Sequence, residues 1–107
     1  MQNYKIYIED ALRMINRIEK FKDKSLKEVQ NWDATLMRLQ VIGESVKKIP
    51  KDVKKSMSSM DWEKFENLRN FISHVYTQVF PKIILDIIDN EIPKLKLGLL
   101  QLKGNVK

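Results

Sequence analysis

Apolar residues recur every three or four positions along most of the chain, and this period restricts the fold more than any other feature of the sequence. Because an α-helix turns once in about 3.6 residues, such a stripe predicts an amphipathic helix with one buried face. The first stripe belongs to a helix expected over about 3–22, with Leu12 at its edge. The stripe itself consists of Tyr4, Ile8, Ala11, Ile15 and Ile18.

A second stripe predicts a helix that ends at Pro50, because proline disfavours helical backbone before it. Ser25 and Glu28 form a capping-box pattern, so a helical segment is expected to begin there. A short bend is expected at 31–32, with a second start near Asp33. The stripe consists of Leu36, Leu39, Ile42, Val46 and Ile49.

Two more helices are predicted after a polar connection at 51–59. Asp61 suits the N-cap of the third helix, and Pro81 suits the first turn of the fourth. Pro93 lies inside the last stripe and predicts a kink or a split there. The two stripes are Phe65, Leu68, Ile72, Val75 and Val79, and then Ile84, Ile88, Ile92, Leu95, Leu99 and Leu102.

No segment alternates with period two, and the chain has only 3 Gly and 3 Pro for tight turns. The predicted fold class is therefore all-α: an up-and-down helical bundle of four to five helices, with a kinked or split last helix. With 107 residues, the chain is expected to form a single helical domain over 1–107.

The chain carries 20 Lys and Arg against 14 Asp and Glu, a formal net charge of +6. This surplus favours an anionic partner such as nucleic acid, although a lysine-rich solubilising surface explains it equally well. The absence of cysteine excludes disulfides and thiolate metal sites. We find no apolar run long enough to span a membrane and no signal-peptide pattern, so a cytoplasmic protein is expected.

The one histidine, His74, lies in a segment that can support chemistry, five residues after Arg69 and two before Tyr76. On a helical wheel with Arg69 at zero, the apolar stripe centres at about 280°, while His74 falls at about 140° and Asn70 at about 100°. Ser73 and Tyr76 lie within about 40° of Arg69. His74 therefore points away from the core, and an ordinary surface histidine remains an alternative.

Because Arg69 and His74 do not share one strip of the helix, a single helix does not converge both groups on one phosphate. A second copy related by a two-fold axis would supply converging groups, which favours a homodimer. RNA cleavage by the neighbouring 2′-hydroxyl suits these residues. A histidine can transfer the protons, and an Arg fork neutralises the phosphate. No metal site or cofactor is expected, because carboxylates are scattered and there is only one His.

The motif Arg, four residues, His, one residue, Tyr, formed by Arg69, His74 and Tyr76, resembles the HEPN superfamily and, more closely, its HepT-like toxin branch. Asn70 matches the polar residue that follows the Arg in this family. Segment 39–50 resembles the family's Ile-Gly-Glu helix.

The match extends beyond the motif. Trp62 stands where the family usually has a tryptophan, and segment 93–95 resembles its Pro-x-Leu ending. The resemblance therefore covers nearly the whole chain.

The resemblance implies a metal-independent endoribonuclease that acts as the toxin of a toxin–antitoxin pair, with a homodimer formed across the motif helix. Arg69 and His74 would be catalytic, and Asn70 and Ser73 supporting. The expected partner is a minimal nucleotidyltransferase antitoxin that silences the toxin by attaching AMP to Tyr76. Two alternatives remain: a non-catalytic helical partner of a nucleotidyltransferase, and a basic RNA-binding adaptor without cleavage activity.

Several further residues allow two interpretations. Glu44 is either a group that orders an Arg or His, or simply the neighbour of Gly43 in a close helix contact. A basic run is a candidate RNA contact through Lys47, Lys48 and Lys51, or a solvated helix end. The run consists of Lys47, Lys48, Lys51, Lys54 and Lys55. For Trp32 and Trp62, core packing is preferred over base stacking.

Overall fold

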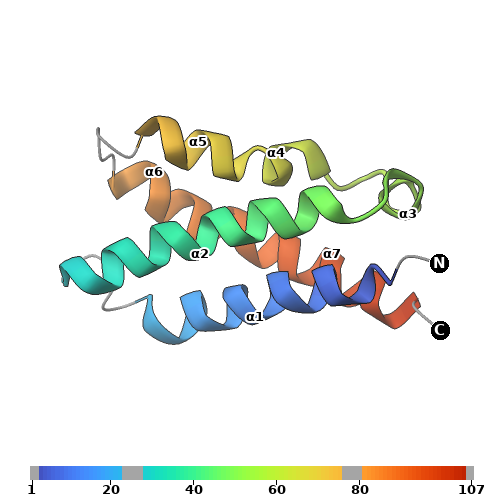
Figure 1. The fold of residues 1–107 in the computed structure, drawn as a ribbon, viewed down its shortest axis with the longest axis horizontal. Helices are drawn as coiled ribbons and strands as arrows, with labels where there is room; N and C mark the ends of the chain where they lie inside the picture. The colour runs from blue at the N-terminus through green and yellow to red at the C-terminus, as the bar shows by residue number, and fades with distance from the viewer. Residues whose placement is uncertain (1–2, 23–27, 76–80, 106–107) are drawn as a thin grey trace.

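The computed structural model describes residues 3–22, 28–75 and 81–105, and at positions 74, 75 and 81 the description covers the backbone. Most of these residues are helical, and the helices run up and down the long axis of the molecule in an antiparallel arrangement (Figure 1). The elements in chain order are α1 (Lys5–Phe21), α2 (Val29–Lys48), α3 (Lys51–Lys55), α4 (Trp62–Glu66), α5 (Leu68–Val75), α6 (Pro81–Asp86), η1 (Ile87–Glu91) and α7 (Ile92–Asn105).

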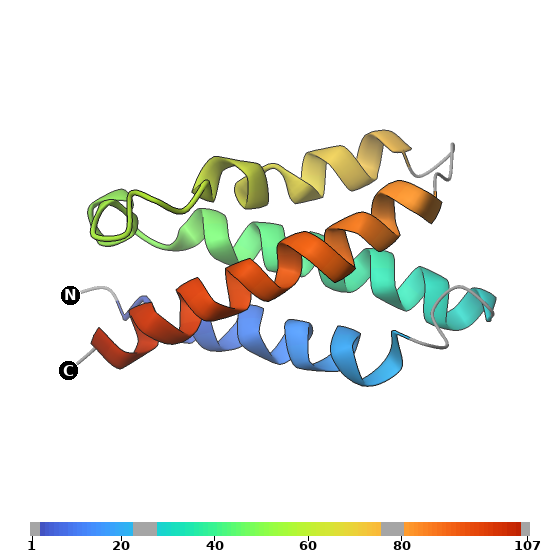
Figure 2. The same ribbon diagram turned by 180° about the vertical axis from the view of Figure 1, so that it is seen from behind.

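The predicted all-α bundle is confirmed. α4 and α5 follow one another along one direction, and α6, η1 and α7 form one long interrupted helix, so the described part of the chain has four long helical stretches and the short α3 (Figure 2). α2 lies between α1 and the α4–α5 stretch, and α7 packs against α1 (Figures 1 and 2). None of the described helices is long and apolar enough to cross a membrane.

The predicted stripes form the core. All predicted stripe residues of α2 and of the last stretch are buried, and so are those of α1 except half-buried Tyr4. In the third stretch Phe65, Leu68 and Ile72 are buried, whereas the side chain of Val75 and residue Val79 lie outside the described parts. Helical periodicity therefore identified which face of each helix points inward.

Helix ends show where the sequence predictions hold and where they fail. Asp61 caps α4 as predicted, since its side-chain oxygen accepts a hydrogen bond from the backbone N–H of Lys64 at 3.3 Å. The bend expected at 31–32 was wrong, because α2 continues through it and the Trp32 N–H donates to the Glu28 carbonyl. Ser25, proposed as a helix start, lies outside the described residues.

The split expected at Pro93 is present, but it lies a few residues earlier. A π-helical turn, η1, precedes α7, and the Ile92 N–H donates to the Ile87 carbonyl five residues back. Proline has no N–H to donate and its ring crowds the carbonyl four residues before it, here that of Asp89. Widening the preceding turn accommodates Pro93 while the helix continues.

Candidate active site

Helix α5 carries the motif, and its exposed face holds three of the predicted site residues. Leu68 and Ile72 are buried in the core, so the opposite side of α5 faces outward. Arg69, Asn70 and Ser73 are accordingly exposed. His74 is the penultimate residue of α5, where the backbone is described, and Tyr76 lies outside the described residues.

Arg69 forms an ion pair with Glu44 of α2. The guanidinium nitrogen lies 3.4 Å from the carboxylate oxygen, and the two side chains are 57% and 40% exposed. The pair therefore lies at the surface, where an incoming phosphate can reach the remaining N–H groups of the guanidinium. The structure thus brings together two residues that are 25 positions apart in the sequence.

Gly43 explains why this contact forms. A Cβ atom added at Gly43 would lie 2.9 Å from the backbone nitrogen of Arg69 and 3.2 Å from the backbone oxygen of Phe65. Any larger residue would hold α2 away from the start of α5. The two interpretations of the Gly43–Glu44 pair are therefore compatible, since the close helix contact places Glu44 beside Arg69.

The five lysines of the basic run do not form one exposed surface, because Lys54 is buried. Lys54 is buried, and its ammonium donates hydrogen bonds to the Val46 carbonyl at 3.0 Å and to the Glu66 carboxylate at 2.5 Å. It therefore ties α3 to α2 and α4 and is unavailable to an RNA phosphate. Lys47, Lys48 and Lys51 are exposed at the end of α2 and the start of α3.

Lys47 and Lys48 lie about one helical turn beyond Glu44 on α2. Lys48 also lies over the ring of Tyr7, with its nitrogen 5.8 Å from the ring centroid. The three lysines are thus near the Glu44 end of the site but not in contact with Arg69 in the structure as described, and their role as RNA contacts stays a prediction.

Both tryptophans contribute to packing. Trp62 is buried, and its indole N–H donates to the backbone oxygens of Lys54 and Met57 at 3.0 and 3.1 Å. Trp32 is half-buried against the core. The expectation that they pack rather than stack on bases is met for Trp62, which holds the connection before α4.

Sequence reasoning did not find the Lys54–Glu66 pair. The two residues are 12 positions apart, and a lysine within a basic run gives no local sign that its side chain is buried. Among the described residues, no three His, Cys, Asp or Glu side chains gather as a group that could hold a metal ion.

A family model described as "Ribonuclease HepT-like" matches residues 7–102. The chain belongs to the HepT-like ribonuclease family. The match includes both Glu44 and the whole of α5, so the ion pair and the motif lie within the part of the chain that defines membership.

Curated relatives agree with this assignment. The chain is 28% identical over 100 residues to the "Probable ribonuclease HepT" of Thermococcus cleftensis, covering 89% of this chain and 91% of that protein. It is 30% identical over 102 residues to a "Putative RNase" of Caldanaerobacter subterraneus subsp. tengcongensis, covering 90% of each.

A longer relative is the "Gamma-glutamylcyclotransferase and putative RNase" of Methanocaldococcus jannaschii, 27% identical over 106 residues and 94% of this chain. The chain spans about half of that relative, 48% of its length. No solved structure matches the chain. Each of these three relatives carries the word ribonuclease or RNase in its name.

Proposed function

We propose that this protein is a metal-independent endoribonuclease whose site contains Arg69 and His74. The observation that carries the proposal is the exposed guanidinium of Arg69. Arg69 lies on α5, the helix that carries the motif histidine, and is paired with Glu44 of α2. His74 would remove the proton from the RNA 2′-hydroxyl or donate one to the leaving oxygen. Arg69 would neutralise the charge that gathers on the phosphate oxygens.

Asn70 and Ser73 have supporting roles in this proposal. Both are exposed on α5 between Arg69 and His74, so their hydrogen-bonding groups are available to substrate. An amide or hydroxyl there can hold a phosphate or ribose oxygen without adding charge. In this proposal the site needs no metal ion. Arg69 neutralises the charge on the phosphate, and His74 transfers the proton.

The active unit in this proposal is a homodimer. Arg69 faces α2, as its pair with Glu44 indicates, and position 74 is about 140° away from it around the helix. Two copies related by a two-fold axis can bring Arg69 of one and His74 of the other to the same phosphate. Exposed Met37 and Val41 on α2, 65% and 36% accessible, give this face apolar surface for the contact.

Control by an antitoxin completes the proposal. A minimal nucleotidyltransferase would catalyse attack of the Tyr76 phenol oxygen on the α-phosphate of ATP, with loss of the phenol proton and release of pyrophosphate. The attached AMP would place a negative charge near Arg69 and block RNA. This step rests on the family's motif, since Tyr76 lies outside the described residues.

RNA cleavage in the presence of EDTA tests the ribonuclease proposal. The purified chain should cleave a labelled RNA and leave a 2′,3′-cyclic phosphate, whereas Arg69→Ala and His74→Ala should lose at least about a hundredfold in rate. Leu97→Gln, at a position of α7 that is 71% exposed, is the matched control. Equal activity in all variants, or strict dependence on a metal, would contradict the proposal. Absence of cleavage by the wild-type chain would favour a non-catalytic partner of the nucleotidyltransferase.

A further inference from the structure

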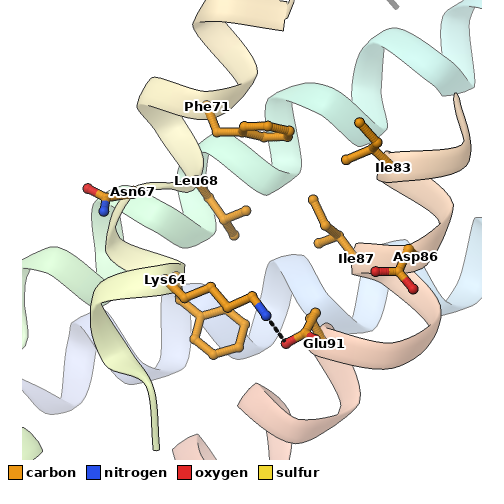
Figure 3. Close-up of a pocket in the computed structure, with 9 residues that line it drawn as sticks. Lys64, Asn67, Leu68, Phe71, Ile83, Asp86, Ile87 and Glu91 are labelled. Carbon is orange, nitrogen blue, oxygen red and sulfur yellow. Dashed lines mark ion pairs between the residues drawn. The ribbon is translucent and has the colours of Figure 1, made fainter. Parts of the chain in front are cut away.

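A cleft of about 410 Å³ lies between the α4–α5 stretch and the α6–η1 stretch. Figure 3 shows Leu68 and Phe71 facing Ile83 and Ile87 across it. Its size falls in the range of small-ligand sites, roughly 300–1,000 Å³. The cleft is thus large enough for a flat heterocycle and is lined mainly by apolar side chains.

The two walls of the cleft belong to different helical stretches. α4 and α5 pack on α2, whereas α6 and η1 continue along the chain into α7 as one interrupted helix. One ion pair, Lys64 to Glu91 at 2.9 Å, bridges the walls at one end (Figure 3). Ile83 is left 43% exposed and Phe71 half-buried, so apolar surface remains open to a ligand.

The Phe71–Ile83 end of the cleft lies nearest the motif residues of α5. Asn67, Phe71 and position 74 are spaced at i, i+4 and i+7, so they share one strip of the helical stretch. Position 74 is about 4.5 Å beyond Phe71 along the helix axis. Arg69 lies on the other flank, toward α2. A ligand in the cleft would therefore lie on the His74 side of the site.

Polar groups at the rim fit a neutral ligand with N–H donors. The carboxylates of Asp86 and Glu91 line the cleft together with the Lys64 ammonium, so its charge is net negative. Such a rim disfavours a phosphate group. Asp86 accepts a hydrogen bond from the Asn90 amide at 2.6 Å through one oxygen, and its second oxygen is available to a ligand.

An unstacked nucleobase has this chemistry. Its faces pack on aromatic and aliphatic side chains, its edges carry N–H donors, and its charged backbone can stay outside. Guanine fits a carboxylate well, because its N1–H and amino donors point the same way. Recognition of splayed bases on their Watson–Crick edges is the usual mode for single-stranded RNA.

We propose that the cleft binds the base of the nucleotide next to the scissile phosphate, with a preference for guanine read by Asp86. The proposal rests on the ribonuclease function proposed above and adds the determinant of its sequence preference. Phe71 and Ile83 would hold the faces of the base. Asp86 is then a specificity residue that plays no part in proton transfer.

Cleavage of an RNA pool with randomised loop positions tests the proposal. The wild-type protein should cleave next to guanine at least about tenfold faster than next to other bases, and an abasic site there should raise KM by a similar factor. Asp86→Asn should lose the preference with kcat little changed. Asp89→Asn, a neighbouring exposed carboxylate paired with Lys22, should keep it and serves as the matched control. Equal kcat/KM for abasic and guanine-containing RNA would overturn the proposal.

Binding of free guanosine separates this inference from the ribonuclease proposal. Methyl NMR signals of Ile83 and Ile87 should shift on titration with guanosine, and Asp86→Asn should abolish the shift. If guanosine shifts these signals but the protein cleaves no RNA, the base-binding proposal would stand and the ribonuclease proposal would be wrong. Cleavage without these shifts, or shifts that follow only protein concentration, would reject the base site and assign the cleft to another copy of the chain.

Discussion

The guanidinium of Arg69 lies 3.4 Å from the carboxylate of Glu44 and joins α5 to α2 across the surface of the bundle. Because both groups are exposed, the pair contributes at most about 1 kcal/mol to folding. The pair mainly orients the Arg69 guanidinium. Glu44 lies on one side of it, and the N–H groups on the other side remain available to a phosphate. The same carboxylate also competes with an incoming phosphate for Arg69.

Glu44→Gln should tighten RNA binding by about threefold at low salt, because the competing charge is removed while the side chain keeps its size. The difference should vanish at high salt, where exposed charges are screened. Titration of labelled RNA in a His74→Ala background measures binding without cleavage. Glu9→Gln, which alters a similarly exposed pair between Glu9 of α1 and Lys103 of α7, is the control. An affinity change that is independent of salt would contradict this account.

Gly43→Ala should destabilise the protein by about 1–3 kcal/mol, because the new methyl group meets the rigid backbone of Arg69 at 2.9 Å. It should also weaken activity by moving Glu44 away from α5. Gly98→Ala is the matched control, since the atom nearest its added methyl group is the end of the flexible Met60 side chain. Urea unfolding of both variants measures the difference, and equal stabilities would show that the α2–α5 contact tolerates a Cβ.

Lys54→Met should lower the free energy of unfolding by about 1–3 kcal/mol, since the Val46 carbonyl and the Glu66 carboxylate would each lose a hydrogen-bond donor. Lys55→Met, at an exposed neighbouring position, should change it by less than about 0.5 kcal/mol. Thermal unfolding of the two variants at one pH makes the comparison. Similar losses in both would mean that lysine charge, rather than the buried contact, stabilises the chain.

Stability should decrease as the pH rises above about 10.5 through the titration of Lys64. The hydrogen bond from Lys64 to Glu91 raises the pKa of the amine above its ordinary value of 10.5. A group whose pKa is higher in the folded state stabilises it fully at pH values below the unfolded pKa, and the benefit is lost as the amine deprotonates. Urea midpoints measured between pH 8 and 11.5 should fall less for Lys64→Gln than for wild type. Parallel curves would exclude a role for this pair.

The helix faces could be predicted from the sequence because helical periodicity is a local signal. The stripe in α2, from Leu36 to Ile49, is buried as predicted. The bend expected near Trp32 was wrong because that expectation rested on local residue preferences, whereas Trp32 packs against the core and the helix continues.

The break between α4 and α5 was not predicted. Asn67 lies between them, where Gly43 of α2 approaches the backbone at Phe65 and Arg69. This contact joins residues more than twenty positions apart, so no local pattern indicates it. The same applies to the Arg69–Glu44 pair: the sequence identified both residues as candidates, but only the helix crossing brings them together.

The π-helical turn η1 determines how far α6 is rotated about the helix axis relative to α7. A π turn holds one more residue than the α-helical turn it replaces, so its removal would rotate one half against the other by about 100°. With α7 fixed in the core, Ile83 and Asp86 would then leave the wall that faces Phe71. A one-residue deletion within 87–91 would therefore leave α7 packed on α1 but turn both the cleft wall and the buried Ile84 away from their present neighbours, so one extra residue sets the register of the cleft and of this part of the core together.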